Sequence, residues 1–315
     1  FSDIPRGDDW PRIEKFKRNP PMLDIVITGA ELEHDLLLDL THEVHPARTL
    51  YRPSEPSLRL EDVPDDADLT HLEAEAARHN ADFFVLPAGL SIKSFKAFFF
   101  DMDSTLIENE CIDDMAFAAG CFDEVCQMTK EAMEGKWPFA ENLQRRVKLL
   151  AGAPLSVVDH SVESARFSVG AEVLMKFARR NGLALYVVSG GFTLITRPIA
   201  KKLGMTGAVS NELVIENGLL TGDVVGPAGG RILDARGKRR AVEVLSQLHG
   251  ASLSEVLCCG DGANDVEMIR SAGLGVAFHA KPVVQQLARY RINHSGLDAI
   301  MLFFRESWRD ALPFA

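Results

Sequence analysis

The sequence lacks the features of several special classes of protein. No window reaches the ~18 apolar residues of a membrane-spanning helix, and no signal-peptide pattern stands at the start, where the first residue is Phe1. The five cysteines are odd in number and contain no Cys-x-x-Cys pair, so neither a disulfide framework nor a zinc knuckle is expected. Reduced thiols of this kind are typical of a cytoplasmic protein, which is the location that the sequence predicts.

Positive charge is also scarce. The 34 lysine and arginine residues are outnumbered by 45 aspartates and glutamates, which gives a net charge of −11. Nucleic acids and anionic membranes bind basic surfaces, so we expect neither as a partner. A small phosphate is not excluded, because one or two local cations and a metal ion can hold it. The length of 315 residues allows one large domain and a smaller one.

Residues 1–92 are predicted to form a small α+β domain. The elements expected in it are a charged, proline-rich arm over residues 1–21, a strand from Met22 ended by Gly29, a helix over 32–40, a loop over 51–68, a helix over 69–79 and a strand over 82–87. This strand–helix–helix–strand outline is compatible with a reduced ACT-like regulatory domain and equally with a unit that forms a homodimer. The sequence leaves both open.

Residues 93–315 are predicted to form an α/β domain with a Rossmann-like parallel sheet. Its apolar strands are expected over residues 97–100, 183–189, 256–260 and 275–278. Continuous apolar runs that alternate with helices indicate a parallel sheet covered on both faces. An insert over about 111–172 has helical spacing and follows the end of the first strand, where it can form a cap over a site. Asn217-Gly218 predicts a hairpin with a type I′ turn.

Paired acids follow two of the predicted strands. Asp101 and Asp103 come directly after the first, and Asp261 and Asp265 follow the third across a glycine-rich turn. Carboxylates gathered at the edge of a sheet repel one another unless a cation or proton lies between them. Either stretch alone could be a helix N-cap cluster, but the two together favour a Mg²⁺ site, because Mg²⁺ prefers a few carboxylate oxygens and retains water.

Two further stretches suit a phosphate. Ser189-Gly190-Gly191 ends the second strand with a hydroxyl and backbone N–H groups that can face an anion, although such a segment is often only a turn. Lys238 begins a predicted helix among other basic residues, where a solvated face is the ordinary interpretation. Its position after the other three stretches is what makes it a candidate.

These four stretches, in this order over about residues 97–282, resemble the motifs of the haloacid dehalogenase-like hydrolases: Asp-x-Asp, a Ser or Thr at a strand end, a Lys, and Gly-Asp-x-x-x-Asp. Within that superfamily the sequence is similar to the phosphoserine phosphatase family. The segments that carry this similarity are 101–106, 131–135, 189–192, 260–265 and 280–282. The first 92 residues lie outside the resemblance, although bacterial members can have a small extra N-terminal domain.

The resemblance implies a role for each candidate residue. Asp101 would be the nucleophile that forms an aspartyl phosphate, and Asp103 the general acid and base. Mg²⁺ would be held by Asp101, the main-chain carbonyl of Asp103, Asp261 and Asp265. Phosphate would be bound by Ser189, Gly190, Lys238 and Asn264. The substrate would be bound by Glu110 at its ammonium, by Arg146 at its carboxylate, and by Phe139 and Met133 at its apolar part.

The expected activity is hydrolysis of O-phosphoserine, the last step of serine biosynthesis. The first alternative is a phosphatase or phosphotransferase of the same superfamily that acts on another small phosphate monoester. Such a substrate would have no ammonium and carboxylate for Glu110 and Arg146, which could be plain surface charges. The second alternative is a regulatory binding protein, but it would have no need for a repulsive acidic cluster.

Overall fold

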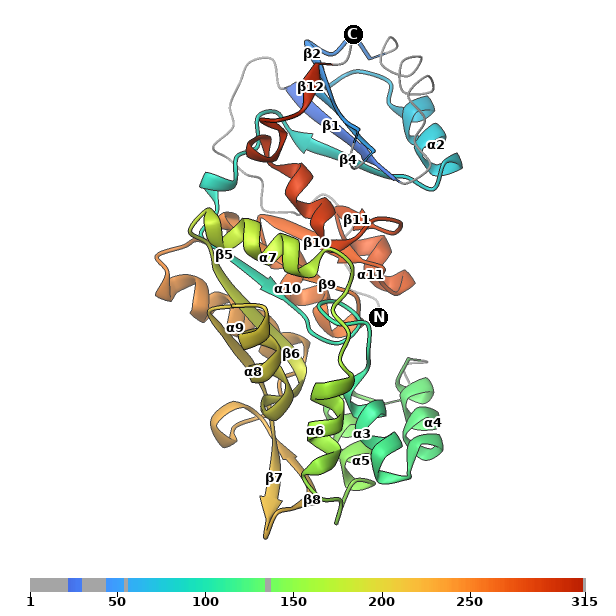
Figure 1. The fold of residues 1–315 in the computed structure, drawn as a ribbon, viewed down its shortest axis with the longest axis vertical. Coiled ribbons are helices and arrows are strands. Elements are labelled where there is room, and N and C mark those ends of the chain that lie inside the picture. The colour runs from blue at the N-terminus through green and yellow to red at the C-terminus, as the bar shows by residue number, and fades with distance from the viewer. Residues whose placement is uncertain (1–21, 30–43, 54–55, 134–136, 314–315) are drawn as a thin grey trace.

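The computed structural model describes residues 22–29, 44–53, 56–133 and 137–313. Two sheets organise them (Figure 1). The larger sheet has the strand order β11-β10-β9-β5-β6-β7-β8 and the smaller one β12-β2-β3-β1-β4. Neighbours from β11 to β7 pair in parallel, whereas β7 and β8 are antiparallel, as are all neighbours in the smaller sheet.

The strands of the larger sheet are β5 (Ala97–Phe100), β6 (Ala184–Phe192), β7 (Gly207–Glu216), β8 (Leu219–Val225), β9 (Val256–Gly260), β10 (Leu274–Phe278) and β11 (Tyr290–Ile292). Those of the smaller sheet are β1 (Met22–Thr28), β2 (Arg48–Arg52), β3 (Ser57–Pro64), β4 (Asp82–Pro87) and β12 (Leu312–Pro313). The α-helices are α2 (Thr70–Arg78), α3 (Cys111–Ala119), α4 (Phe122–Met133), α5 (Phe139–Lys148), α6 (Ser156–Ser164), α7 (Ala171–Arg180), α8 (Thr193–Lys202), α9 (Ala235–Leu248), α10 (Val266–Ser271) and α11 (Pro282–Leu287). The 3-10 helices are η1 (Ile92–Ser94), η2 (Pro227–Gly229), η3 (Leu253–Glu255), η4 (Ala263–Asp265), η5 (Leu297–Phe303) and η6 (Arg305–Trp308).

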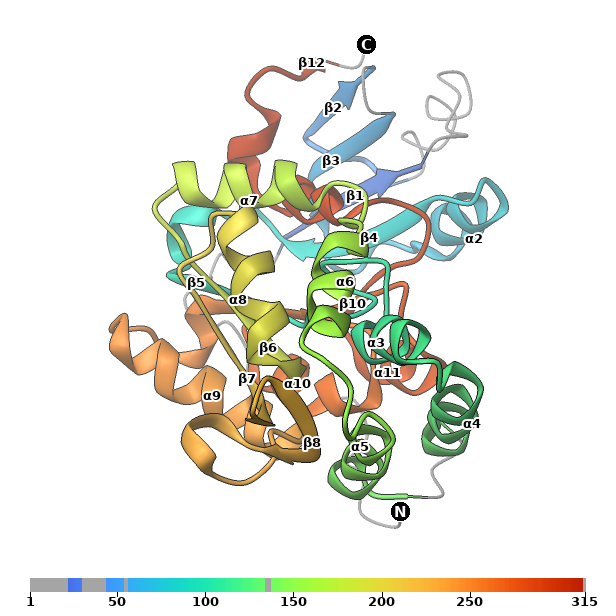
Figure 2. The same ribbon diagram turned by 60° about the horizontal axis from the view of Figure 1, so that its bottom comes forward.

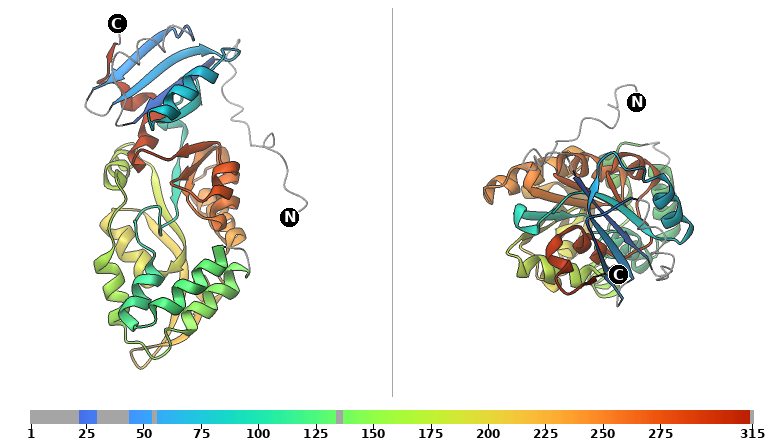
Figure 3. Two further views of the ribbon diagram at one scale, coloured as in Figure 1. Left: turned by 90° about the vertical axis from the view of Figure 1, so that its right-hand side faces the viewer. Right: turned by 90° about the horizontal axis from the view of Figure 1, so that it is seen from above.

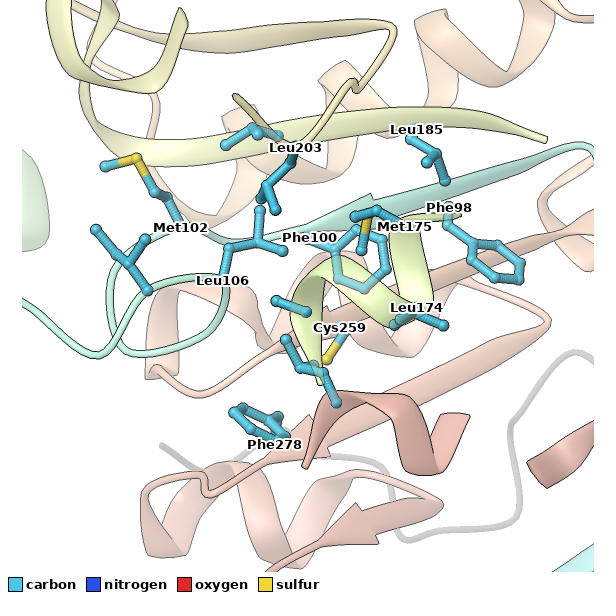
Figure 4. Close-up of a cluster of buried hydrophobic side chains, with 14 of the residues drawn as sticks. Phe98, Phe100, Met102, Leu106, Leu174, Met175, Leu185, Leu203, Cys259 and Phe278 are labelled. Atoms are coloured by element: carbon cyan, nitrogen blue, oxygen red, sulfur yellow. The ribbon is translucent and has the colours of Figure 1, made fainter. Parts of the chain in front are cut away.

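The central strand β5 is buried along its whole length, and its side chains alternate between the two faces of the larger sheet. Phe98 and Phe100 pack in one cluster with Leu174 of α7 (Figure 4). Phe99 packs in a second cluster with Val242 of α9. Helices therefore cover both faces, which confirms the predicted parallel α/β core and explains why its strands are apolar without alternation.

The insert over residues 111–172 is helical, as expected. It contains α3 to α6, and these helices pack on one another beyond the carboxyl ends of β5 and β6 (Figures 1 and 2). The hairpin of β7 and β8 reaches the same bundle, where the N–H of Gly152 donates to the carbonyl of Leu220 (2.8 Å). The predicted turn at Asn217-Gly218 is confirmed, with positive φ at both residues (52° and 78°).

The smaller sheet corrects one prediction. Residues 51–68 were expected to be a loop, but β2 extends to Arg52 and β3 covers Ser57–Pro64. Leu58 and Leu60 face a buried cluster under α2, and Pro64 stands at the end of β3, where a proline costs few ladder hydrogen bonds. The predicted strands at β1 and β4 and the helix at α2 are confirmed. The helix predicted over residues 32–40 lies outside the described residues.

The C-terminal segment joins the two sheets. After β11 the chain forms η5 and η6 and then adds β12 to the edge of the smaller sheet beside β2. Phe303 of η5 packs edge-on against Phe84 of β4, with 4.8 Å between ring centroids. Figure 3 shows the smaller sheet at the end of the molecule opposite α3 to α6. Among the described residues, none of the helices combines the length and apolar composition that crossing a membrane requires.

Candidate active site

Two acidic residues follow neighbouring strands at the carboxyl edge of the larger sheet. Asp101 comes directly after β5 and Asp261 directly after β9, and these strands pair in parallel. The N–H of Asp101 donates to the carbonyl of Cys259 (2.9 Å), so the pairing continues to the acid itself. Parallel pairing therefore brings residues 160 positions apart in the sequence to one edge, where open α/β sheets bind ligands.

The ammonium of Lys238 lies between two carboxylates. Its Nζ is 2.8 Å from Asp101 Oδ2 and 2.7 Å from Asp265 Oδ1, and its side chain is 0% exposed. Burial lowers the pKa of Lys238, but the charges of Asp101 and Asp265 raise it more, so the group remains an ammonium. The lysine is fixed by α9, which begins where the Asp234 side chain accepts the N–H of Gly237 (2.9 Å).

Three carboxylates form a candidate metal site. Oxygens of Asp101, Asp261 and Asp265 lie within 4.8 Å of one another. Asp265 also holds the turn after β9, because its Oδ2 accepts the N–H groups of Asp261 (3.2 Å) and Gly262 (3.0 Å). A compact set of hard oxygen donors of this kind fits Mg²⁺.

The charges in this cluster are incompletely balanced. Burial, together with the charges of Asp101 and Glu110, raises the pKa of Asp261 to about 7, and Lys281 and Lys238 offset this only in part. Burial and the charge of Asp101 likewise hold the pKa of Asp265 well above its usual range. An added cation would relieve this repulsion, which is the electrostatic evidence that the residues suit a metal ion.

Asp103 lies close to the Ser189 loop. Its Oδ1 accepts the N–H of Cys111 (3.0 Å), and Ser189 Oγ accepts the N–H of Gly191 (2.9 Å). A Cβ atom added at Gly191 would stand 3.1 Å from both Asp103 Oδ2 and Ser189 Oγ, so the glycine permits their close approach. Burial and the charge of Glu110 raise the pKa of Asp103 to about 7, although the Cys111 contact opposes the shift.

A cleft of about 1210 Å³ opens between the sheet edge and the helical insert. Asp101, Asp103, Asp261 and Asn264 line it on the side of the sheet. On the side of the insert, the residues lining it that the sequence singled out are Glu110, Phe139 and Arg146. The sequence candidates from both regions therefore face one cavity, and the buried Lys238 and Ser189 lie behind its floor.

The polar end of the insert carries charge of both signs. Glu110 precedes α3 and accepts from Ser104 Oγ (2.8 Å). Arg146 of α5 is buried at 8% exposure and donates from one terminal nitrogen to Thr129 Oγ1 (3.4 Å), while its Nε has no hydrogen-bond partner among the described residues. Burial raises the pKa of Glu110 and lowers that of Arg146, and each charge opposes the shift of the other.

Phe139, the first residue of α5, lies over the Gly190 side of the cleft. A Cβ atom added at Gly190 would stand 2.5 Å from Phe139 Cζ, so the absence of a side chain at Gly190 makes room for the ring. These two candidates are thus brought together from the insert and the sheet. The side chain of Met133 lies outside the described part of the structure.

Some residues at the site had no role in the sequence analysis. Thr105 Oγ1 donates to Asp261 Oδ1 (3.1 Å), and Lys281 Nζ is 3.9 Å from Asp261 Oδ2. Both stand inside the segments that carry the family resemblance, which is the signal that could have found them. The amide of Asn211 donates to the carbonyl of Gly190 (2.8 Å) and fixes this loop, but nothing in the sequence around Asn211 indicates it.

A family model of haloacid dehalogenase-like hydrolases matches residues 98–270, more than half of the chain. The chain belongs to this family. Within it, a curated phosphoserine phosphatase from Mycobacterium tuberculosis is 40% identical over 226 residues, which are 72% of this chain and 54% of that protein. The chain thus spans about half of the length of that relative.

Solved structures agree with the fold. A haloacid dehalogenase family hydrolase from Salmonella enterica serovar Typhi has a TM-score of 0.80 at 26% identity and covers 92% of this chain and 100% of its own. A phosphoserine phosphatase in the form of a phospho-aspartyl intermediate analogue has a TM-score of 0.62 at 38% identity, over 67% of this chain and 99% of its own. The first similarity includes the smaller sheet, and the second is confined to about two thirds of the chain.

Proposed function

We propose that this chain hydrolyses O-phospho-L-serine to L-serine and phosphate, in the cytoplasm, as the last step of serine biosynthesis. One observation carries the proposal: a single cleft is lined by the acids Asp101 and Asp103 on one side and by the opposite charges of Glu110 and Arg146 on the other. The first pair suits phosphoryl transfer to a carboxylate, and the second suits the two charges of an amino acid. The curated phosphoserine phosphatases among its relatives support the same activity.

In the first step, a carboxylate oxygen of Asp101 attacks phosphorus while the bond from phosphorus to the serine oxygen breaks. The carboxyl of Asp103 gives its proton to that oxygen, so serine leaves as an alcohol and not as an alkoxide. Its pKa of about 7 allows a substantial protonated fraction at neutral pH. The N–H of Met102 donates to Asp101 Oδ1 (2.7 Å) and Lys238 holds Oδ2, so the nucleophile has a fixed orientation.

In the second step, water attacks the aspartyl phosphate. The carboxylate of Asp103 now accepts the proton of that water, phosphate leaves, and Asp101 is restored as a carboxylate. Dividing the reaction in this way replaces one slow displacement by two easier ones. Asp103 lies near Ser189 and Gly191, which supports its role as the proton carrier for a phosphate bound by this loop.

The phosphate oxygens would be bound by the buried Lys238, by Ser189, by the backbone of Gly190 and by Asn264. Ser189 Oγ accepts from Gly191, so its own O–H proton can point to a phosphate oxygen. Asp101, Asp261, Asp265 and the main-chain carbonyl of Asp103 would hold Mg²⁺, which when bound supplies positive charge to the phosphoryl oxygens. Cations fixed around these oxygens stabilise the charge of the transition state without reorganisation.

Substrate choice would be made by the insert. The guanidinium of Arg146 can bind a carboxylate through two parallel hydrogen bonds, and its unpartnered Nε is one available donor. Glu110 would accept the ammonium of the substrate, and Phe139 and Met133 would cover its apolar part. We further propose that residues 1–92, with β12 added to the edge of their sheet, form a small regulatory or dimerising domain, and that 93–315 form the phosphatase with its cap at about 111–172.

The proposal is tested by phosphate release from O-phospho-L-serine, phosphothreonine, phosphotyrosine and sugar phosphates, each with and without Mg²⁺. We expect phosphoserine to have the highest kcat/KM and Mg²⁺ to be required. A sugar phosphate that outperforms phosphoserine would assign the site to another small monoester. Covalent trapping on a residue other than Asp101 would overturn the mechanism.

A further inference from the structure

A carboxylate of the smaller sheet is bound inside a loop of the larger sheet. Asp82, the first residue of β4, is 3% exposed. Its oxygens accept three successive backbone N–H groups after β11, those of Asn293 (2.7 Å), His294 (3.2 Å) and Ser295 (2.8 Å). Consecutive N–H groups that converge on one anion form a nest, and a buried, charge-assisted contact of this kind fixes the backbone that donates it.

The loop held by Asp82 holds a second loop. His279, which follows β10 with a positive φ of 43°, donates its backbone N–H to the carbonyl of Ile292 (2.8 Å). Its ring Nε2 donates to the carbonyl of Ser295 (2.9 Å). The conformation of His279 is one that most residues adopt at a cost, so it depends on the contacts that surround it.

The second loop ends at the candidate metal site. Two residues after His279, the N–H of Lys281 donates to the main-chain carbonyl of Asp261 (2.9 Å). The Lys281 ammonium stands 3.9 Å from Asp261 Oδ2 and lines the cleft. The position of this cation, and of the Asp261 backbone, therefore depends on the loop of residues 279–281.

We propose that Asp82 is a positioning residue for the phosphate site: through residues 293–295 and His279 it fixes the loop that places Lys281 beside Asp261. The kinetic part of this inference rests on the proposed phosphatase activity. The smaller sheet, which contributes no residue to the cleft among those described, is thereby connected to it through a continuous set of hydrogen bonds.

The first measurement is amide hydrogen exchange on the full chain, which needs no activity. In Asp82→Asn we expect exchange at least about tenfold faster at residues 293–295 and also at 279 and 281. In His279→Asn, where asparagine tolerates the positive φ, exchange should rise at 279 and 281 while 293–295 stay protected by Asp82. The matched control is Glu306→Gln, which weakens another contact of a carboxylate with a backbone N–H, since Glu306 of η6 accepts from Ile92 of η1 (3.1 Å) and, among the described residues, has no hydrogen bond to either loop.

The second measurement is steady-state kinetics with phosphoserine and p-nitrophenyl phosphate. Asp82→Asn and His279→Asn should lower kcat/KM roughly three- to tenfold for both substrates, because Lys281 lines the cleft beside Asp261, where the phosphate that they share would bind. Glu306→Gln should stay within about twofold of wild type. Lys281→Met should show the same loss, and adding Asp82→Asn to it should lower kcat/KM no further, since Asp82 acts through Lys281.

Two results would overturn the inference. The first is an exchange rate at residues 279 and 281 of Asp82→Asn that equals the wild-type rate. The second is a loss of kcat/KM on introducing Asp82→Asn that is as large in the Lys281→Met background as in the wild type. If Asp82→Asn does not fold, His279→Asn still tests the second half of this connection, and wild-type exchange at 281 in that variant would also overturn the inference. Absence of phosphatase activity in the wild-type protein would refute the proposed function instead, and the exchange data would still test whether Asp82 holds the loop.

Discussion

Replacing Arg146 by alanine tests the proposed substrate at a single contact. Arg146 is buried in the insert, and its charge is opposed by Glu110, Asp113 and Asp103 nearby. A charge-assisted hydrogen bond to a substrate carboxylate contributes ~1.5–3 kcal/mol, and ~1.4 kcal/mol corresponds to one decade. Arg146→Ala should therefore lower kcat/KM for phosphoserine roughly 10- to 100-fold.

The comparison substrate separates recognition from general damage. The reactive end of p-nitrophenyl phosphate is the same, but it has no carboxylate, so its hydrolysis should change less than about threefold. Arg146→Lys should be intermediate for phosphoserine, because it retains the charge and loses the planar fork of donors. Lys148→Ala is the matched control, since it removes an exposed cation from the same helix, and should leave both substrates unchanged.

The assay is phosphate release for both substrates, with the unfolding midpoint of each variant measured beside it. Equal losses on the two substrates would refute the reasoning, because Arg146 would then serve the phosphate or the fold. No loss on either substrate would mean that Arg146 does not contact the substrate. Glu110→Gln should follow the pattern of Arg146→Ala, with the largest effect where the substrate amine is charged.

Four further outcomes are expected. Asp101→Asn should abolish turnover without unfolding the chain, and a phosphate analogue such as beryllofluoride should label Asp101 only in the wild type, as mass spectrometry would show. Chelation by EDTA should silence the enzyme, Mg²⁺ should restore it and Ca²⁺ should do so poorly, because Ca²⁺ takes more ligands at longer distances; full activity in chelated buffer would contradict the metal site. Gly190→Ala should raise KM, since the new Cβ would displace the Phe139 ring, and Phe139→Leu should restore part of the loss; an unchanged KM in Gly190→Ala would contradict the close packing. The folded-state pKa of Asp261 is raised from 3.8 to about 7, so the folded protein binds more protons than the unfolded chain between these pH values. Metal-free protein should therefore lose stability as the pH rises from about 4 to 7. Denaturant titrations at both pH values should show this loss, and Mg²⁺ should reduce it.

The class of fold and the positions of the candidate acids follow from the sequence. The apolar runs of β5, β9 and β10 are buried on both sides, so their composition alone indicates a covered parallel sheet. Acids directly after such strands can only lie at the carboxyl edge, which is why the sequence places Asp101 and Asp261 at the same edge of the sheet. The residues Asn217-Gly218 were likewise sufficient to predict the hairpin turn, because both residue types tolerate the positive φ that the turn requires.

The sequence was insufficient where a residue's environment comes from distant parts of the chain. Lys238 stands among basic residues and suggests a solvated face, but Asp101 and Asp265 surround it and leave it 0% exposed. Arg59 stands between Leu58 and Leu60 in β3, where alternation predicts an exposed side chain, yet it is buried because Asp24 and the carbonyls of Leu302 and Phe303 accept its donors. A charged side chain enters a core only with such partners, and these lie 27 to 244 positions away.

Tertiary structure alone decided how the smaller sheet is joined to the site. The two-residue strand β12 is too short to carry a periodic signal, and it exists because β2 offers it an unpaired edge. Asp82 is an ordinary acid at the start of a strand until the backbone of residues 293–295 closes around it. Composition and periodicity report which face of an element is apolar, but the partner of a single polar group depends on the path of the whole chain.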